Sequence, residues 1–588
     1  ERTLWDEDLN RARLTRSKRR AHIIEIILFF CFFAVFVRLF FLMVLDHGEL
    51  MQKAEQQYKK VRTLKPHRGV IWDNNMRQMA VSIETKSLYA VPSQIHDVKG
   101  LTTKLAPILK VPERKLRKKI LSKREKDFLW IKRKMDERVY RRVSMMKHQM
   151  ARQQLGVLSE TKRYYPKGQV ASHVLGYTDI DNDGLDGIEL KYDQYIKGET
   201  KKVWLGRDAR GYGLSKGPED GLPGNDLILT IDENIQYIVE REIGDALKEW
   251  KAEAVVAIMM KPETGAILAM ANRPTYDVNY AGKSDAARRR NRAITDIYEP
   301  GSTFKAILAT AVLEEGMVRL NEDFDVSKGF IRVPGGRIRD VHKHKILTFK
   351  EVIQKSSNVG SVQLGMKLGE ETYYRYIRNF GFGEKTGIDL IGEVKGLLRS
   401  PENWSGRSLA SLSIGQEIGT TPLQILRAYA AIANGGKLMR PFLVSRIISP
   451  SGEVIKHFSP VVEKRIMSDV TAGIMRDILK SVVEEGGTAR KASVRGNIVA
   501  GKTGTAQMID PETRRYSSKD YVSSFVGFIP ADNPEIALIV VVYKPRGARY
   551  GGIVAAPVFR KIVEHTFVYL DIPMGKEDKN VILVSTSR

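Results

Sequence analysis

The sequence predicts an α/β (α+β) protein whose larger part is a five-stranded antiparallel sheet flanked by helices. Three observations lead to this prediction. A long apolar run lies near the N-terminus, a mixed and strongly basic segment follows it, and two pairs of apolar strands after residue 253 are each joined by a turn-rich connection. A chain of 588 residues is long enough to form two or more domains, each with its own core.

The apolar run at residues 23–45 is long enough to span a bilayer as one helix. Glu25 and Arg38 are the charged residues inside it. Seven basic residues precede it: Arg2, Arg11, Arg13, Arg16, Lys18, Arg19 and Arg20. By the positive-inside rule, residues 1–22 are a cytoplasmic tail and everything after residue 45 lies outside the cytoplasm. A cleaved signal peptide is disfavoured, because the apolar core is too long and residues 46–49 offer no small-residue cleavage site.

The formal net charge of +27 suggests nucleic acid as a partner, but an exported domain would meet none. Much of the excess lies in residues 110–163, where apolar residues recur at helical spacing. We interpret this region as amphipathic helices with a solvated basic face, and an attraction to anionic lipids or polymers is the alternative. The single cysteine excludes an intramolecular disulfide, and the ten histidines lack ligand spacing, so we expect no metal and no cofactor.

The strands of the predicted sheet lie far apart in the sequence. Residues 254–260 and 266–271 form a hairpin, residues 525–529 and 536–543 form a second pair, and a strand through residue 502 completes the sheet. A final helix at residues 555–569 would cover one face. Turn residues at 221–226 mark a boundary, so we expect a domain at 46–225, a second domain at 226–570, and a short tail at 571–588.

Three short motifs follow one another in the second domain. They are S-x-x-K from Ser302 to Lys305, S-x-N from Ser356 to Asn358, and K-T-G from Lys502 to Gly504, separated by 54 and 146 residues. Each motif alone could arise by chance, and an isolated Ser302 or Ser356 would be an ordinary helix cap or turn residue. Their order, spacing and local setting together indicate a serine enzyme that forms an acyl intermediate.

Ser302 follows a turn at residues 299–301 and opens an apolar helix that we expect to run to residue 315. Lys305 lies three residues on, so the two side chains share a face. Burial and the positive end of the helix dipole disfavour the ammonium form of Lys305. A neutral amine there could take the proton of Ser302 and make it a nucleophile.

The third motif is expected to be an edge strand that can pair with an extended peptide. Lys502 would supply positive charge, and the hydroxyls of Thr503 and Thr505 would supply donors, for a substrate carboxylate, while Gly504 allows another backbone to approach. The backbone N–H groups of Ser302 and Thr505 would form the oxyanion hole. In the middle motif, Ser356 would relay protons near Lys305 and Asn358 would bind a substrate amide.

With these motifs the chain resembles a class B penicillin-binding protein, a monofunctional peptidoglycan transpeptidase, from about residue 35 to about residue 570. Further matching segments include Arg68-Gly69-Val70-Ile71-Trp72-Asp73, Arg163-Tyr164-Tyr165-Pro166, Gly187-Ile188-Glu189, Asn291-Arg292-Ala293, Thr421-Pro422-Leu423-Gln424 and Ser524-Phe525-Val526-Gly527-Phe528. One departure is Asp73-Asn74-Asn75-Met76, where the family usually has Asp-Arg-Asn-Gly.

The resemblance implies an elongated α+β pedestal (dimerisation-like) domain before the catalytic one, in the bacterial cytoplasmic membrane with a periplasmic catalytic domain. It implies stem peptides as donor and acceptor, beta-lactams as covalent inhibitors, and a polytopic glycan polymerase of the SEDS family and other division proteins as partners. Ser356-Ser357-Asn358 followed by Val359-Gly360 resembles the division-type (septal) members. An elongation-type transpeptidase, a beta-lactamase, a beta-lactam sensor and a non-catalytic division scaffold are the alternatives.

Overall fold

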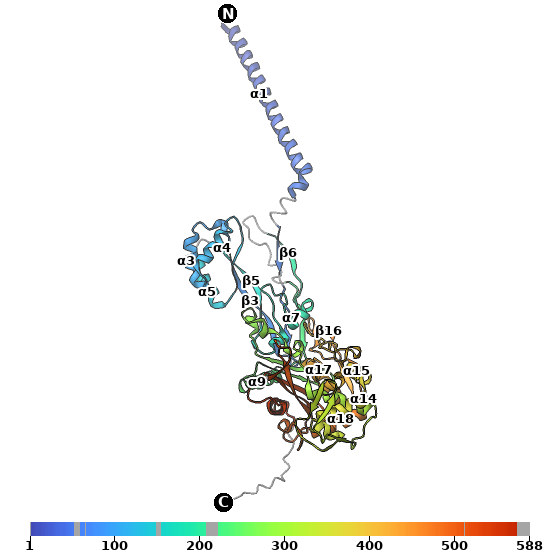
Figure 1. The fold of residues 1–588 in the computed structure, drawn as a ribbon. Coiled ribbons are helices and arrows are strands. Elements are labelled where there is room, and N and C mark those ends of the chain that lie inside the picture. The colour runs from blue at the N-terminus through green and yellow to red at the C-terminus, as the bar shows by residue number, and fades with distance from the viewer. Residues whose placement is uncertain are drawn as a thin grey trace. The chain divides into compact units, whose positions relative to one another are not determined.

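The computed structural model describes residues 2–51, 59–64, 66–148, 154–206, 221–510 and 512–572 (Figure 1). The chain forms two units. One contains residues 1–66 and 199–222, and the other contains residues 67–198 and 223–588. The predicted tail at 571–588 lies almost entirely outside the described residues.

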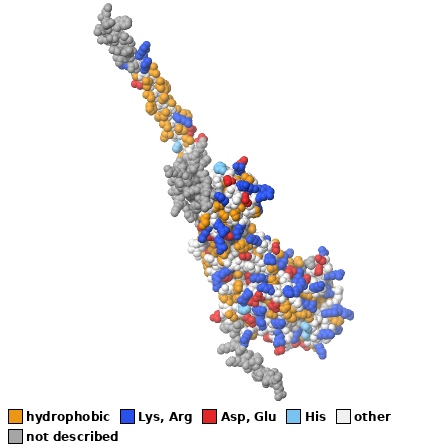
Figure 2. All heavy atoms as spheres, turned by 90° about the vertical axis from the view of Figure 1, so that its left-hand side faces the viewer, with side chains coloured by type: hydrophobic (Ala, Val, Ile, Leu, Met, Phe, Trp, Pro, Cys, Tyr) orange, Lys and Arg blue, Asp and Glu red, His pale blue; other side chains and the backbone are white. Residues whose placement is uncertain are grey.

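The first unit contains the apolar helix. Helix α1 (Arg2–Phe40) continues into a π-helical turn, η1 (Phe41–Leu45), and strand β1 (Lys59–Leu64) pairs antiparallel with β6 (Lys201–Gly206). Figure 2 shows hydrophobic side chains along this helix and basic ones toward its N-terminal part. Among the described residues, the segment Lys18–Leu45 is the one stretch of helix long and apolar enough to cross a membrane. It contains the predicted span at residues 23–45.

The second unit contains the five-stranded antiparallel sheet that the sequence predicts. Its strand order is β18-β19-β20-β8-β9. The bounds are β18 (Ala500–Ile509), β19 (Tyr516–Ile529), β20 (Ile536–Tyr543), β8 (Ala254–Met260) and β9 (Ile267–Arg273). The predicted strand pairs are confirmed, although β19 begins nine residues before the predicted start at residue 525.

Helices cover both faces of this sheet because side chains alternate along its strands. Val255, Ala257 and Met259 point to one core, formed with α9 (Glu233–Glu249) and α20 (Ala556–Tyr569). Val256, Ile258 and Met260 point to the other. That second core contains the helices α12 (Lys305–Glu314), α17 (Pro422–Ala433) and α18 (Asp469–Ser481).

Smaller elements surround α12. The helices are α13 (Phe349–Gln354), α14 (Asn358–Leu368), α15 (Glu370–Asn379) and α16 (Ser408–Ser413). Two short antiparallel pairs accompany them: β10 (Asp323–Asp325) with β13 (Ile346–Thr348), and β11 (Phe330–Val333) with β12 (Gly336–Arg339). The loop between β12 and β13 leads toward the N-terminus of α14, as the hydrogen bonds below show.

A second sheet joins strands from both sides of the predicted boundary at residue 225, in the order β16-β15-β7-β2-β3-β4, with β5 beside β3. Its strands are β16 (Val454–His457), β15 (Val444–Ile448), β7 (Asp226–Leu229), β2 (Ile71–Trp72), β3 (Gln78–Ala90), β4 (Leu129–Met135) and β5 (Leu155–Tyr164). The β2–β7 pair is parallel and the others are antiparallel. The two parts of the chain therefore share a backbone ladder, and the exact domain bounds stay a prediction.

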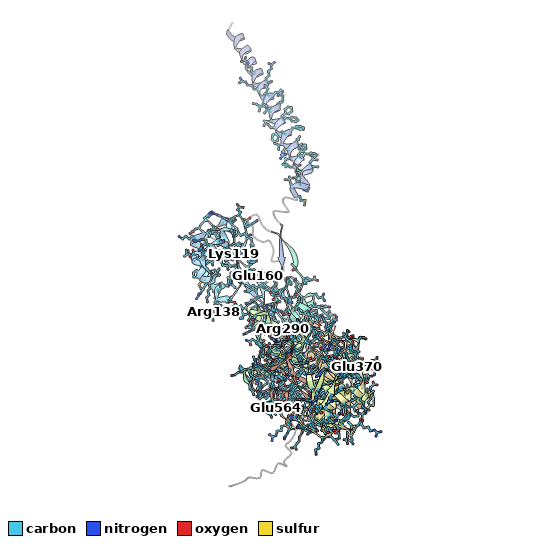
Figure 3. The ribbon with its side chains drawn as sticks, in the orientation of Figure 1. Lys119, Arg138, Glu160, Arg290, Glu370 and Glu564 are labelled. Carbon is cyan, nitrogen blue, oxygen red and sulfur yellow. The ribbon has the colours of Figure 1, made fainter. Side chains whose placement is uncertain are left out.

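The basic region at residues 110–163 is only partly helical. Helices α3 (Val98–Leu109), α4 (Glu113–Leu121) and α5 (Glu137–His148) form one lobe, with Lys119 and Arg138 on α4 and α5 (Figures 1 and 3). Leu116 and Ile120 are buried on the inner face of α4, as predicted for an amphipathic helix. Residues 129–135 form strand β4 instead, because they pair with β3 and bury Ile131 and Met135.

A buried ion-pair network joins strand β5 of the second sheet to Arg68, Glu189 and Asp193. Glu189 accepts hydrogen bonds from Arg68 Nε and Arg163 Nε, both at 2.6 Å, and all three side chains are at most 1% exposed. Arg68 also donates to Asp193 at 2.6 Å. Arg163 Nη1 donates to the carbonyl of Gly69, which ties strand β5 to the segment before β2. Removing one of these charged side chains would leave a buried charge without its partner.

We expect Glu189→Gln to lower the free energy of unfolding by roughly 3–5 kcal/mol, because it leaves two buried guanidinium groups without their shared carboxylate. Chemical denaturation of the purified protein measures this. Glu137→Gln removes an exposed partner of Arg141 on α5 and should cost less than about 1 kcal/mol. Equal stability of the two variants would contradict a structural role for the network.

Candidate active site

Ser302 lies in a single 3₁₀ turn, η4 (Gly301–Phe304), that leads directly into α12. The predicted helix at 302–315 is therefore a short 3₁₀ turn followed by an α-helix that ends at Glu314. Gly301 has φ +55° and donates its N–H to the carbonyl of Gly415 at 3.0 Å. On the other side, Tyr429 OH donates to the carbonyl of Thr303 at 2.7 Å. The turn that presents Ser302 is held by hydrogen bonds to two distant segments, one through the backbone of Gly415 and one through the side chain of Tyr429.

Lys305 is fully buried because α12 is apolar on all sides. Burial lowers the pKa of Lys305 to about 7, against an opposing effect from the negative charge of Asp340. A substantial fraction of this side chain is therefore a neutral amine near neutral pH, which agrees with the expectation from its sequence setting.

The amine of Lys305 contacts the middle motif. Its Nζ donates to the Ser356 carbonyl at 2.8 Å, to Ser356 Oγ at 3.4 Å and to Asn358 Oδ1 at 2.7 Å. Ser356 has φ +61°, a left-handed conformation that is strained for a serine and that occurs here beside the site. Within the described ranges, no hydrogen bond joins Ser302 Oγ to Lys305 Nζ, so in this state the lysine is turned toward Ser356 and Asn358.

A carboxylate that sequence reasoning missed holds the middle motif in place. Asp340 accepts hydrogen bonds from Ser357 Oγ at 2.8 Å, from Val359 N at 3.0 Å, and from the N–H of Asn358. Asn358 Nδ2 donates to the carbonyl of Arg339 at 2.9 Å. Asp340 lies in a loop 16 residues before Ser356, and no spacing rule links such a residue to a helix N-terminus.

The K-T-G motif lies in β18, which is an edge strand of the five-stranded sheet, as predicted. A Cβ on Gly504 would lie 2.3 Å from Ser524 Oγ and 2.9 Å from the carbonyl oxygen of Pro300. Glycine is therefore required for β18 to lie against the turn that carries Ser302. The hydroxyl of Thr505 accepts a hydrogen bond from Gly551 N at 3.1 Å, which leaves its own proton free to be donated.

Lys502 is fully buried without a carboxylate beside it among the described residues. Its Nζ lies 3.4 Å from Thr503 Oγ1 and 3.5 Å from the Thr503 carbonyl. Burial holds the pKa of Lys502 well below its ordinary value, and repulsion from Lys305 adds to this. The positive charge expected at Lys502 thus needs an anionic ligand to stabilise it.

A second carboxylate missed by the sequence lies three residues before Ser302. Glu299 accepts hydrogen bonds from Glu417 N at 2.9 Å and from Tyr516 OH at 3.1 Å, and burial raises its pKa. Tyr516 begins β19, so this contact joins the β18–β19 hairpin to the segment before the Ser302 turn. The structure thus brings Ser302, Lys305, Ser356, Asn358 and the K-T-G strand into one site.

Two family models match the chain. Residues 255–564 match the penicillin binding protein transpeptidase domain, and residues 63–229 match the penicillin-binding protein dimerisation domain. The transpeptidase match contains all three motifs, from Ser302 to Thr505.

Similar proteins cover nearly the whole chain. Stage V sporulation protein D of Bacillus subtilis (strain 168) is 34% identical over 96% of this chain and 88% of its own length. Peptidoglycan D,D-transpeptidase FtsI of Escherichia coli (strain K12) is 32% identical over 93% of this chain and 92% of its own length. The crystal structure of penicillin binding protein 3 from Mycobacterium tuberculosis complexed with aztreonam is 28% identical, with a TM-score of 0.68, over 88% of this chain and 98% of that one. This chain therefore belongs to the penicillin-binding protein family, with a dimerisation domain and a transpeptidase domain, as its motifs predict.

Proposed function

We propose that this protein is a membrane-anchored peptidoglycan D,D-transpeptidase in which Ser302 is the nucleophile and Lys305 is its base. The observation that carries the proposal is the buried amine of Lys305, whose pKa is lowered to about 7, between the Ser302 turn and the middle motif. Such an amine can accept the proton that a free serine would not release.

In the acylation step, Ser302 Oγ attacks the carbonyl carbon between the two terminal D-alanines of a stem peptide. Lys305 takes the hydroxyl proton, and the backbone N–H groups of Ser302 and Thr505 stabilise the developing oxyanion. As the C–N bond breaks, the proton returns to the leaving amine through Lys305 and Ser356, whose Oγ lies 3.4 Å from Lys305 Nζ. D-alanine departs and leaves an ester on Ser302.

The K-T-G strand positions the donor peptide. β18 has an edge at which an extended peptide can pair, and Lys502, Thr503 and Thr505 bind the terminal carboxylate. That carboxylate supplies the counter-charge that Lys502 lacks. Asn358 donates one of its two Nδ2 hydrogens to Arg339 and has the other for a substrate amide.

In the second step, an amine from a neighbouring stem peptide attacks the ester carbonyl. Lys305 accepts a proton from that amine, the ester C–O bond breaks, and Ser302 recovers its hydroxyl proton. The products are a new peptide cross-link and free enzyme. A beta-lactam would be attacked in the same way and would remain on Ser302.

The proposal also includes a membrane anchor at the N-terminus and protein partners. Residues 1–22 lie in the cytoplasm, residues 23–45 cross the membrane, and the domains at 46–225 and 226–570 lie in the periplasm. The basic residues before the span support this orientation. A polytopic glycan polymerase of the SEDS family and other division proteins are the proposed partners. The S-S-N middle motif supports a septal role.

Ser302→Ala should abolish covalent labelling by a fluorescent penicillin, because it removes the attacking oxygen. Gel fluorescence after incubation measures the label, and its decay measures deacylation. Ser451→Ala, at an exposed turn serine, should label like wild type. Rapid loss of the label would indicate a beta-lactamase instead, and equal labelling of Ser302→Ala would refute the nucleophile.

The rate of acylation should rise with pH through a midpoint near 7, because protonated Lys305 cannot accept a proton and its pKa is about 7. Lys305→Ala should reduce the plateau rate by roughly 10²- to 10⁴-fold. The rate of labelling by a fluorescent penicillin, measured at a series of pH values on either side of 7, tests both effects. Lys464→Ala, at an exposed strand lysine, is the control. A pH-independent wild-type rate would exclude Lys305 as the base.

Depletion of the protein in its host should give long, undivided cells, because the proposed role is in the septal wall. Microscopy of depleted cells carrying the Ser451→Ala or the Ser302→Ala gene tests this, and only the first should restore division. Rounded cells on depletion would favour an elongation role. Restoration by Ser302→Ala would indicate a scaffold.

A further inference from the structure

Asp340 is the acidic residue in closest association with the middle motif. It follows strand β12 and is half-buried. Its two carboxylate oxygens accept three hydrogen bonds: Oδ2 from Ser357 Oγ at 2.8 Å, and Oδ1 from the N–H groups of Val359, at 3.0 Å, and Asn358. These donors lie at the first turn of α14, where backbone N–H groups have no partner within the helix.

The carboxylate therefore acts as a cap supplied by a distant loop. Ser357 caps α14 from within the chain, by accepting the N–H of Gly360 at 3.0 Å, and its own hydroxyl proton goes to Asp340. The negative charge also matches the positive end of the α14 dipole. Ser357 and Asp340, which are joined by a hydrogen bond, thus fix the turn at Ser356 and Asn358, where Ser356 has the strained φ of +61°.

The same loop holds the side chain of Asn358. The backbone carbonyl of Arg339, directly before Asp340, accepts a hydrogen bond from Asn358 Nδ2 at 2.9 Å. This orients Asn358 Oδ1 toward Lys305 Nζ, at 2.7 Å. A change at residue 340 would therefore move the two nearest acceptors of Lys305, namely Asn358 Oδ1 and the Ser356 carbonyl.

Asp340 acts on Lys305 through charge as well. The negative charge of Asp340 raises the pKa of Lys305, and the charge of Lys305 in turn lowers the pKa of Lys502. The other groups around Lys305 Nζ, on Ser356 and Asn358, are neutral. Asp340 is thus the anion that limits how far burial can lower the basicity of Lys305.

We propose that Asp340 is a positioning residue of the acylation step, which holds the S-S-N turn against Lys305 and sets the charge beside it. This inference rests on the proposed function, because it gives Asp340 a role only through Lys305. Asp340 touches no reacting atom, and its effect passes through Ser357, Asn358 and Lys305.

Asp340→Asn tests the proposal, because it keeps the shape of the side chain and removes its charge and one of its two acceptor atoms. We expect the plateau rate of labelling by a fluorescent penicillin to fall roughly 10- to 100-fold, the range for losing hydrogen bonds to a charged group. Asp323→Asn makes the same charge change at an exposed position on β10 and should leave the rate unchanged. Asp340→Glu, which keeps the charge, should recover part of the rate.

The pH profile separates this role from a merely structural one. Asp340 raises the pKa of Lys305, so its removal lowers that pKa further, and the rise in rate should move to lower pH in Asp340→Asn. A variant that is only less stable would show a lower unfolding midpoint with the wild-type pH profile, and that result would overturn the proposal. A wild-type rate and profile in Asp340→Asn would overturn it as well.

Labelling of the wild-type protein in the same experiment distinguishes a failure of the proposed function from a failure of the proposed role of Asp340. Labelling of wild type but not of Ser302→Ala, together with an unchanged Asp340→Asn, would leave the proposed function intact and refute the role of Asp340. Absence of label on the wild type would refute the proposed function and the role of Asp340 with it.

Discussion

The burial of the Lys305 amine is the constraint on which the rest of the site depends. A charged ammonium inside an apolar helix is costly, and the neutral form is favoured there without any chemical modification. The surrounding polar atoms are few, and they come from one short turn at Ser356 and Asn358. The turn must therefore be held accurately, and Asp340 from the β12–β13 loop holds it through hydrogen bonds from Ser357, Asn358 and Val359.

Close backbone approach is the second constraint. The turn that carries Ser302 lies between the segment at Gly415 and strand β18. A Cβ on Gly415 would lie 2.1 Å from the Gly301 carbonyl oxygen, and a Cβ on Gly504 would lie 2.9 Å from that of Pro300. Three segments that are far apart in the sequence thus pack backbone against backbone. Glycine at these points lets the turn at Ser302 and strand β18 lie directly against each other.

Much of this architecture could be predicted from the sequence, because the signals were local. The continuous apolar runs of β8, β9 and β20 and the amphipathic face of α4 each depend on a few neighbouring residues. The motifs at Ser302 and Lys502 were recognisable for the same reason. Strand β4 was missed because its burial depends on pairing with β3, whose paired residues lie 39 to 49 positions earlier in the sequence. Asp340 and Glu299 were missed because their partners are assembled only by the tertiary fold.

Lys502 is buried without a neighbouring anion among the described residues, which sets stability against function at this position. A buried lysine with no anion beside it among the described residues makes the folded state less stable than an apolar side chain would, and under the proposed function a bound carboxylate would offset this cost. An apolar side chain of similar length at this position would favour the folded state but could not bind the carboxylate that the proposed function assigns to Lys502. The ligand-free protein is thus less stable than the ligand-bound one would be. Selection for function at residue 502 therefore opposes selection for thermal stability.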